Sequence, residues 1–190
     1  MPELTASGAF EGLLTASPRT APVWIEPAHL RVAGVIARRD QAAAATARGA
    51  AAFGAALPDG PRRVSGPRIA FIGSAPGVWL AVSDEGGPTL NDLRTTFDGL
   101  ASVVDQGGGY GVLRIGGPRA ADLLAAGVFL DLHPAAFPPG SAAATVMAHV
   151  GVVLWRTEES FEILVPRSYA AAVAHWAETT LDDPTLMAPA

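Results

Sequence analysis

Asp131 and His133 are the most chemically suggestive pair of side chains in the sequence. They stand two residues apart on a short extended segment, so both side chains point to the same side. A carboxylate beside an imidazole is able to bind a metal ion or to share a proton. No second histidine lies within three to five residues, because His29, His149 and His175 are scattered. The pattern therefore favours a structural role, with local pairing of the carboxylate and a proline corner after the histidine.

A glycine-rich run, Gly107–Gly111, invites comparison with phosphate-binding loops. Such loops lead into a helix, whose first N–H groups bind the phosphate. Here Val112 and Arg114 occupy positions that the dinucleotide pattern reserves for glycine, and the run precedes a strand-like segment. The chain also has no lysine, which excludes a P-loop lysine and a lysine Schiff base. We interpret the run as a flexible connection.

The remaining candidates for acid–base or nucleophilic chemistry have weak settings. Ser141 and Ser160 lack the G-x-S-x-G pattern of a nucleophile elbow. Glu158, Glu159 and Glu162 surround a predicted turn and strand edge. Paired carboxylates are able to act as general acid and base, but this placement is typical of a solvated hairpin. The sequence therefore assigns no catalytic, cofactor-binding or metal-binding residue to this chain.

Arg114 and three tryptophans are candidates for contacts rather than for catalysis. Arg114 interrupts an apolar strand, and alternation turns its side chain away from the core. Two interpretations stay open: a bridge to a carboxylate of another subunit, or an exposed sheet face. Trp155 and Trp176 are expected in the core. Trp24, between two prolines, is expected as an exposed anchor for a partner, because tryptophan is enriched at binding hot spots.

The composition points to a buried surface and excludes several classes of protein. Hydrophobic residues make up 49% of the 190 residues and charged residues 16%, against about 25% in typical globular proteins. A charge-poor exterior indicates burial against a partner, although a bias toward Ala and Gly is the alternative. The net charge of −5 and the absence of a basic cluster beyond pairs such as Arg38-Arg39 argue against nucleic acid.

The absence of cysteine excludes disulfides, thiolate nucleophiles and cysteine-ligated metal centres. The N-terminus carries Glu3 and Glu11 and has no basic segment, unlike a signal peptide. The longest uncharged stretch, Leu132–Trp155, contains Pro134, Pro138 and Pro139 and does not form one spanning helix. We therefore expect a cytoplasmic protein with no membrane association.

Two similar halves should position these side chains. Each reads strand, helix, two strands, helix, which indicates an α+β fold of two ferredoxin-like subdomains. The predicted segments of the first half are strands at 29–36, 67–73 and 78–82 and helices at 40–52 and 89–100. Those of the second half are strands at 111–115, 145–150, 152–156 and 160–165 and helices after Pro118 and after Ser168. The predicted units are a loose arm at 1–20, subdomains at 21–102 and 103–182, and a tail at 183–190.

Several motifs in the second half resemble one family, the gamma subunits of heterotetrameric, flavin-containing sarcosine oxidases. The most specific is the run from Leu130-Asp131-Leu132-His133-Pro134 to Ala136-Phe137-Pro138-Pro139-Gly140. The others are Val104-Asp105, Val112-Leu113-Arg114 with Gly117-Pro118-Arg119, Leu154-Trp155, and Val165 with Arg167-Ser168. Together they cover roughly the last 80 residues.

The resemblance implies a shortened folate-binding aminomethyltransferase-like fold and a noncatalytic, scaffolding role. It implies a complex with alpha, beta and delta subunits that oxidatively demethylates sarcosine to glycine, forms peroxide and passes the one-carbon unit to tetrahydrofolate. FAD, FMN, NAD and tetrahydrofolate would bind to other subunits, and this chain would hold no cofactor. Two alternatives stay open: a stand-alone folate-binding aminomethyltransferase-like protein, and a non-enzymatic binding module of the same fold.

Overall fold

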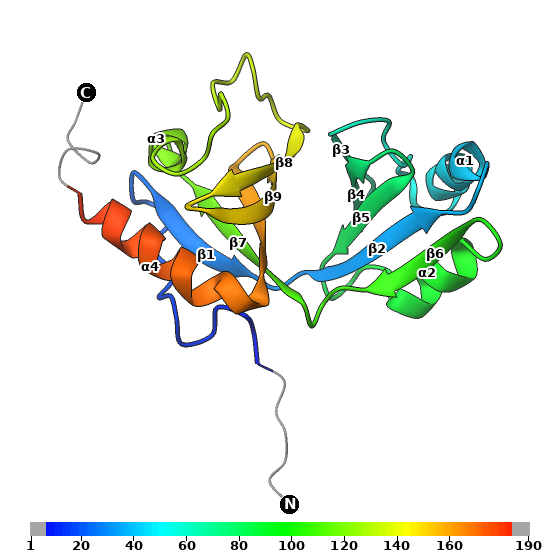
Figure 1. Cartoon of the computed structure of the whole chain (residues 1–190), viewed down its shortest axis with the longest axis horizontal. Coiled ribbons are helices and arrows are strands. Elements are labelled where there is room, and N and C mark those ends of the chain that lie inside the picture. Colours follow the sequence, from blue (N-terminus) through cyan, green and yellow to red (C-terminus); the bar gives the residue numbers. More distant parts are fainter. Residues whose placement is uncertain (1–6, 184–190) are drawn as a thin grey trace, which may run out of the picture.

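The computed structural model describes residues 7–183 and shows two lobes that meet along one side (Figure 1). Each lobe contains a five-stranded antiparallel sheet with helices packed on one face. The other faces of the two sheets turn toward each other where the lobes meet. The expected α+β fold with two sheet-and-helix units is therefore confirmed.

The first sheet has the strand order β3-β4-β5-β2-β6. Its strands are β2 (Arg31–Ala37), β3 (Arg63–Ser65), β4 (Ala70–Ala75), β5 (Val78–Ser83) and β6 (Ala101–Asp105). Helices α1 (Ala42–Phe53) and α2 (Leu90–Thr96) cover it around Phe71 and Phe97, whose ring centroids are 6.0 Å apart. Apart from the short edge strand β3, this is the β-α-β-β-α-β order of a ferredoxin-like unit.

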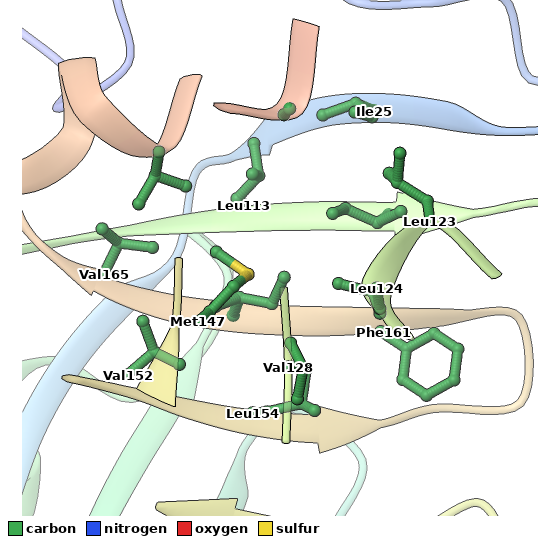
Figure 2. Close-up of a cluster of buried hydrophobic side chains, with 14 of the residues drawn as sticks. Ile25, Leu113, Leu123, Leu124, Val128, Met147, Val152, Leu154, Phe161 and Val165 are labelled. Atoms are coloured by element: carbon green, nitrogen blue, oxygen red, sulfur yellow. The ribbon is translucent and has the colours of Figure 1, made fainter. Parts of the chain in front are cut away.

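The second sheet has the strand order β1-β7-β10-β9-β8. Its strands are β1 (Trp24–Ala28), β7 (Tyr110–Gly116), β8 (Ala142–Met147), β9 (Val150–Arg156) and β10 (Ser160–Pro166). Its helices are α3 (Ala120–Ala125) and α4 (Ala170–Leu181), the latter entered through a 3-10 turn at Arg167–Tyr169. Figure 2 shows the apolar core that forms here, where Leu123 and Leu124 of α3 face the sheet and Leu124 lies beside Phe161.

The second sheet takes one strand from the N-terminal side of the boundary expected near residue 102. β1 precedes the first sheet in sequence but pairs with β7 of the second sheet, where it takes the place that β6 takes in the first. The chain therefore crosses between the sheets twice, at His29-Leu30 and at 106–109. The glycine-rich run thus joins two strands of different sheets.

A third apolar cluster packs between the two lobes. Its buried members come from both sheets and are Val32, Ala70, Ile72, Val82, Val112, Ala142, Trp155 and Leu164. The sheet edges also touch, because Arg63 N donates to Gly140 O at 2.8 Å and Ala142 N to Pro61 O at 3.1 Å. The two lobes are therefore packed against each other as well as connected by the chain.

Helix starts follow the sequence signals only in part. Thr89, the first residue of the helix predicted at 89–100, caps α2 in a capping box with Asp92. The sequence also predicts helix caps at Asp40 and Ser168, and both predictions are wrong. Asp40 has a φ of 60° and precedes Gln41, the residue at the start of α1, whereas Ser168 lies inside the 3-10 turn before α4.

We expected a loose arm at residues 1–20, but from residue 7 onward this segment packs against the second sheet. Phe10 is only 2% exposed and belongs to the core of that sheet, and Leu13 N donates to Phe10 O at 3.1 Å. Phe10 is the buried residue of this turn, whereas Glu11, Gly12 and Leu13 are exposed. Residues 1–6 and most of the expected tail, 184–190, lie outside the described residues. Within 7–183, no helix is long and apolar enough to cross a membrane.

Candidate functional site

A row of polar side chains crosses the second sheet on the face turned away from its helices. Glu26 of β1, Arg114 of β7, Glu162 of β10 and Trp155 of β9 are neighbours in register on four adjacent strands. Ile163 packs in the helix-side core, so the adjacent Glu162 must point toward the first sheet. We call these four residues the polar ladder.

Hydrogen bonds connect all members of the polar ladder. Arg114 Nε donates to Oε1 of Glu162 at 2.8 Å, and its terminal nitrogens lie 2.7 Å from Glu162 and 3.1 Å from Glu26. Trp155 Nε1 donates to Oε2 of Glu162 at 2.8 Å. Both oxygens of the buried Glu162 are therefore occupied, which offsets the cost of removing the carboxylate from water.

At the outer end of the polar ladder, Glu26 accepts a hydrogen bond from Arg19 at 2.6 Å as well as the one from Arg114. Burial alone would raise the pKa of Glu26, but the hydrogen bonds and charges of Arg19 and Arg114 outweigh burial and lower it. A carboxylate that is held ionised and fully occupied as an acceptor is a poor general acid or base. The arrangement therefore indicates a structural role for the ladder.

A cavity of ≈ 250 Å³ lies beside the ladder, between the two sheets. Arg114 and Glu162 line it from the second sheet, and Arg63, Arg68 and Asp84 line it from the first lobe. Nε of Arg63 is buried and has no hydrogen-bond partner within the described part of the chain. Burial lowers the pKa of Arg63, while the charge of Glu162 opposes this shift and that of Arg114 adds to it.

Asp131 and His133 serve the loop that contains them. Asp131 Oδ1 accepts from the backbone N–H of His133 at 2.9 Å, and His133 Nδ1 accepts from the N–H of Ala135 at 3.2 Å. Both side chains are exposed. No group of three or more His, Asp or Glu side chains able to hold a metal ion occurs among residues 7–183. The geometry matches the local pairing that the sequence favours.

The interpretation of the three glutamates as one solvated hairpin is wrong for Glu162. Glu158 and Glu159 are exposed in the turn between β9 and β10, but Glu162 is only 5% exposed. Ser160, also buried, shares a 3.0 Å hydrogen bond with Thr157 within the same turn. The structure thus separates the candidate acid–base groups instead of bringing them together.

The structure confirms the predictions for two tryptophans and corrects the prediction for a third. Trp155 is fully buried and Trp176 packs against the core, as expected. Trp24 is not an exposed anchor, because it begins β1 and is only 5% exposed. The guanidinium of Arg19 covers its ring at 4.7 Å from the centroid. Sequence reasoning also missed Glu26 and Arg63; the only signal for Glu26 is its alternation with Ile25 in β1.

Comparisons with known proteins identify the family of the chain. Residues 38–182 match the family model described as sarcosine oxidase, gamma subunit family. The sarcosine oxidase subunit gamma of an Arthrobacter species is 33% identical over 144 residues, which cover 72% of this chain and 71% of that relative. The corresponding subunit of Corynebacterium sp. (strain U-96) is 34% identical over 133 residues, covering 67% of this chain and 64% of that relative.

Solved structures agree with these matches. A chain of the heterotetrameric sarcosine oxidase from Corynebacterium sp. U-96, in complex with pyrrole 2-carboxylate, superimposes with a TM-score of 0.77 and 27% identity. The match covers 96% of this chain and 93% of that one. Aminomethyltransferase T of the glycine cleavage system from Bartonella henselae shares the fold, with a TM-score of 0.60, 16% identity and coverage of 84% and 45%. The resemblance inferred from the sequence motifs is confirmed.

Proposed function

Because the chain belongs to the sarcosine oxidase gamma subunit family, we propose that it is the small scaffolding subunit of a heterotetrameric sarcosine oxidase-like complex. The observation that carries this proposal is the structural likeness to a chain of such a heterotetramer, which extends over 96% of the present chain. The low content of charged residues, 16%, supports a surface that is covered in an assembly.

The complex would oxidise the N-methyl group of sarcosine, release glycine, reduce oxygen to peroxide and transfer the one-carbon unit to tetrahydrofolate. Alpha, beta and delta subunits would complete it and hold the FAD, FMN, NAD and tetrahydrofolate. The described residues of this chain support a noncatalytic role. Both ladder carboxylates are occupied by Arg114, and the Asp131–His133 pair is engaged with backbone N–H groups of its own loop.

Co-expression tests the proposal directly. The chain, carrying an affinity tag, is expressed with and without the alpha, beta and delta subunits encoded in the same genome. We expect the four to co-purify in equal amounts, with flavin absorbance and sarcosine-dependent peroxide formation. A partner that binds only the folded state adds stability, so the melting temperature of the chain should rise in the complex.

The isolated chain is the matched control. We expect it to be colourless after gel filtration. A flavin band near one flavin per isolated chain would contradict the noncatalytic role. An assembly of the other three subunits that forms and turns over equally well without this chain would contradict the scaffolding role.

A further inference from the structure

The side chains that line the cavity between the sheets carry more positive than negative charge. Three arginines line it, Arg63, Arg68 and Arg114, against two acids, Glu162 and Asp84. The oxygens of Glu162 are already occupied by Arg114 and by Trp155. Asp84 is exposed to solvent. Arg63 and Arg68, from the first lobe, therefore line a cavity whose buried carboxylate, Glu162, already accepts hydrogen bonds from other groups.

Arg63 is held in place by its strand. Its backbone N–H donates to Gly140 O across the lobes at 2.8 Å, and it pairs in register with Ile72 on β4. Because cross-strand partners share a face, Arg63 points toward the second sheet, as Ile72 does. One terminal nitrogen donates to Ser65 Oγ, whereas Nε is buried with no partner in the described residues. A buried N–H without an acceptor is unfavourable, so Nε is a donor in need of one.

Arg68 lines the same cavity and is exposed, so its guanidinium is open to a ligand that enters from solvent. One terminal nitrogen also lies against Gly86, where an added Cβ atom would be 2.4 Å away and would make the flexible side chain shift.

We propose that this cavity binds a small carboxylate, which accepts hydrogen bonds from Nε of Arg63 and from the guanidinium of Arg68. Guanidinium groups present planar donors that match the two oxygens of a carboxylate. The volume of ≈ 250 Å³ lies just below the range of about 300–1,000 Å³ typical of drug-sized ligands, so a molecule of few heavy atoms fits best. The choice of a carboxylate over other oxyanions rests on the proposed function, because sarcosine and glycine are both carboxylates.

The test is a titration of the full chain followed by NMR of its arginine Nε–H groups. Sodium acetate replaces sodium chloride at constant ionic strength, and glycine, which is a net-neutral zwitterion, is added at constant sodium chloride. We expect a saturable shift of the Arg63 Nε–H signal, which the Arg63→Lys variant identifies by removing it. Arg68→Gln should weaken binding about tenfold or more, because it removes a charge-assisted hydrogen bond. Gly86→Ala changes no charge and only makes the flexible Arg68 side chain shift, so it should weaken binding less than Arg68→Gln does.

Arg62→Gln is the matched control. It removes one positive charge from the residue beside Arg63, but Arg62 is exposed and does not line the cavity, so affinity should stay within about twofold. Shifts that grow linearly with every salt, or that weaken equally in Arg62→Gln, would overturn the site. Preferential binding of inorganic phosphate over acetate and glycine would overturn the assignment to carboxylates.

Co-purification tests the proposed function separately from the titration that tests the carboxylate site. Arg68→Gln should still co-purify with the flavoprotein subunits, because its guanidinium makes no hydrogen bond or ion pair within residues 7–183 that would support the fold. A failed titration with intact co-purification overturns the carboxylate site alone. A failure of the unaltered chain to co-purify overturns the scaffolding role and leaves the titration result standing.

Discussion

Arg114 is the residue on which the buried charge of the second sheet depends. Its guanidinium bonds Glu162, whose side chain is 7% exposed, and Glu26, whose side chain is 21% exposed. A buried carboxylate that loses its cation is left with a large desolvation cost, whereas removal of the charge together with the cation is often tolerated. The two glutamates should therefore respond unequally to the loss of Arg114, with Glu162 dominating.

Replacement of Arg114 tests this dependence. Arg114→Met should lower the free energy of unfolding by about 3–5 kcal/mol, because Glu162 becomes an unpaired buried charge. The double variant Arg114→Met/Glu162→Gln should recover much of that loss, since glutamine is neutral and still accepts from Trp155 Nε1. Urea denaturation gives the values. Arg39→Met, at an exposed arginine, is the control and should change stability by less than about 0.5 kcal/mol. A double variant as unstable as Arg114→Met would argue against the unpaired charge as the cause.

Phe137 fixes the proline-rich loop to the core, as the sequence predicts for the only large apolar side chain between Leu132 and Val146. It is 7% exposed, and its ring stacks on Phe161 with centroids 6.5 Å apart. Arg156 also donates to the carbonyl of Phe137 at 2.9 Å. Phe137→Ala should therefore destabilise the chain by about 3–5 kcal/mol, measured by denaturation, and should lower its yield in the complex.

His133→Ala is the comparison in the same loop. The exposed side chain of His133 accepts only from the N–H of Ala135 within the described residues, so its loss should cost about 1 kcal/mol or less. Turnover of the assembled complex should stay nearly unchanged. If turnover vanished while assembly and flavin content were intact, this chain would contribute to the chemistry and the noncatalytic role would be wrong.

Among the strands, β1 holds its place through a close contact between a tryptophan and a glycine. Trp24 pairs with Gly116 of β7, and a Cβ atom added at Gly116 would lie 2.0 Å from the indole ring. The glycine therefore makes room for the indole at the start of β1. This contact lies in the interior of the molecule, since Trp24 is 5% exposed.

Gly116→Ala should push the Trp24 ring out of place and destabilise the chain by about 1–3 kcal/mol. Gly151 of β9 is a matched control in the same sheet, because a Cβ atom there meets nothing within 4 Å. Gly151→Ala should be neutral or stabilising by up to about 1 kcal/mol, since it restricts the unfolded chain. Thermal denaturation compares the two. Equal effects of both substitutions would mean that the indole contact does not hold β1.

The elements that the sequence predicts well are those with local signals. Thr89 and Asp92 mark the start of α2, and the alternation of Phe161, Ile163 and Val165 marks β10. The strand β6 was missed because its residues pair only with β2, which lies far away in sequence. The prolines around Trp24 predict a loop, but β1 is an edge strand, where Pro27 is tolerated.

The candidate site was less predictable, because it is built between the sheets. Alternation shows that Glu162 points away from the helix-side core, but its burial depends on the first sheet covering that face. Arg63 lines the cavity because β3 meets the loop before β8, a contact between segments that no local pattern connects. The pairing of β1 with β7 and the contact between the lobes join residues that are far apart in the sequence. A single sequence carries no direct signal for such contacts.

For the molecule as a unit, the pairing of β1 with β7 means that the second half is not complete alone. A fragment of residues 103–190 lacks β1, the neighbour of β7 at the edge of its sheet. We expect this fragment to give a poorly dispersed 1H–15N spectrum, because the core residues Phe10 and Ile25 are missing. Addition of a peptide of residues 7–28 should restore dispersion. A well-dispersed spectrum of the fragment without the peptide would show that the second lobe folds independently.

The position of β1 has a consequence for the order in which the protein is made. During synthesis β1 emerges from the ribosome first. Its neighbour in the sheet, β7, emerges only after all strands of the first sheet. At about 5–20 residues per second, Trp24 and Ile25 wait roughly 5–20 seconds for the strand that buries them. During this interval the nascent chain exposes an unpaired apolar strand, a known route to aggregation. Synthesis at lower temperature, or with chaperones that bind extended apolar segments, should therefore raise the yield of folded chain more than any change made after release.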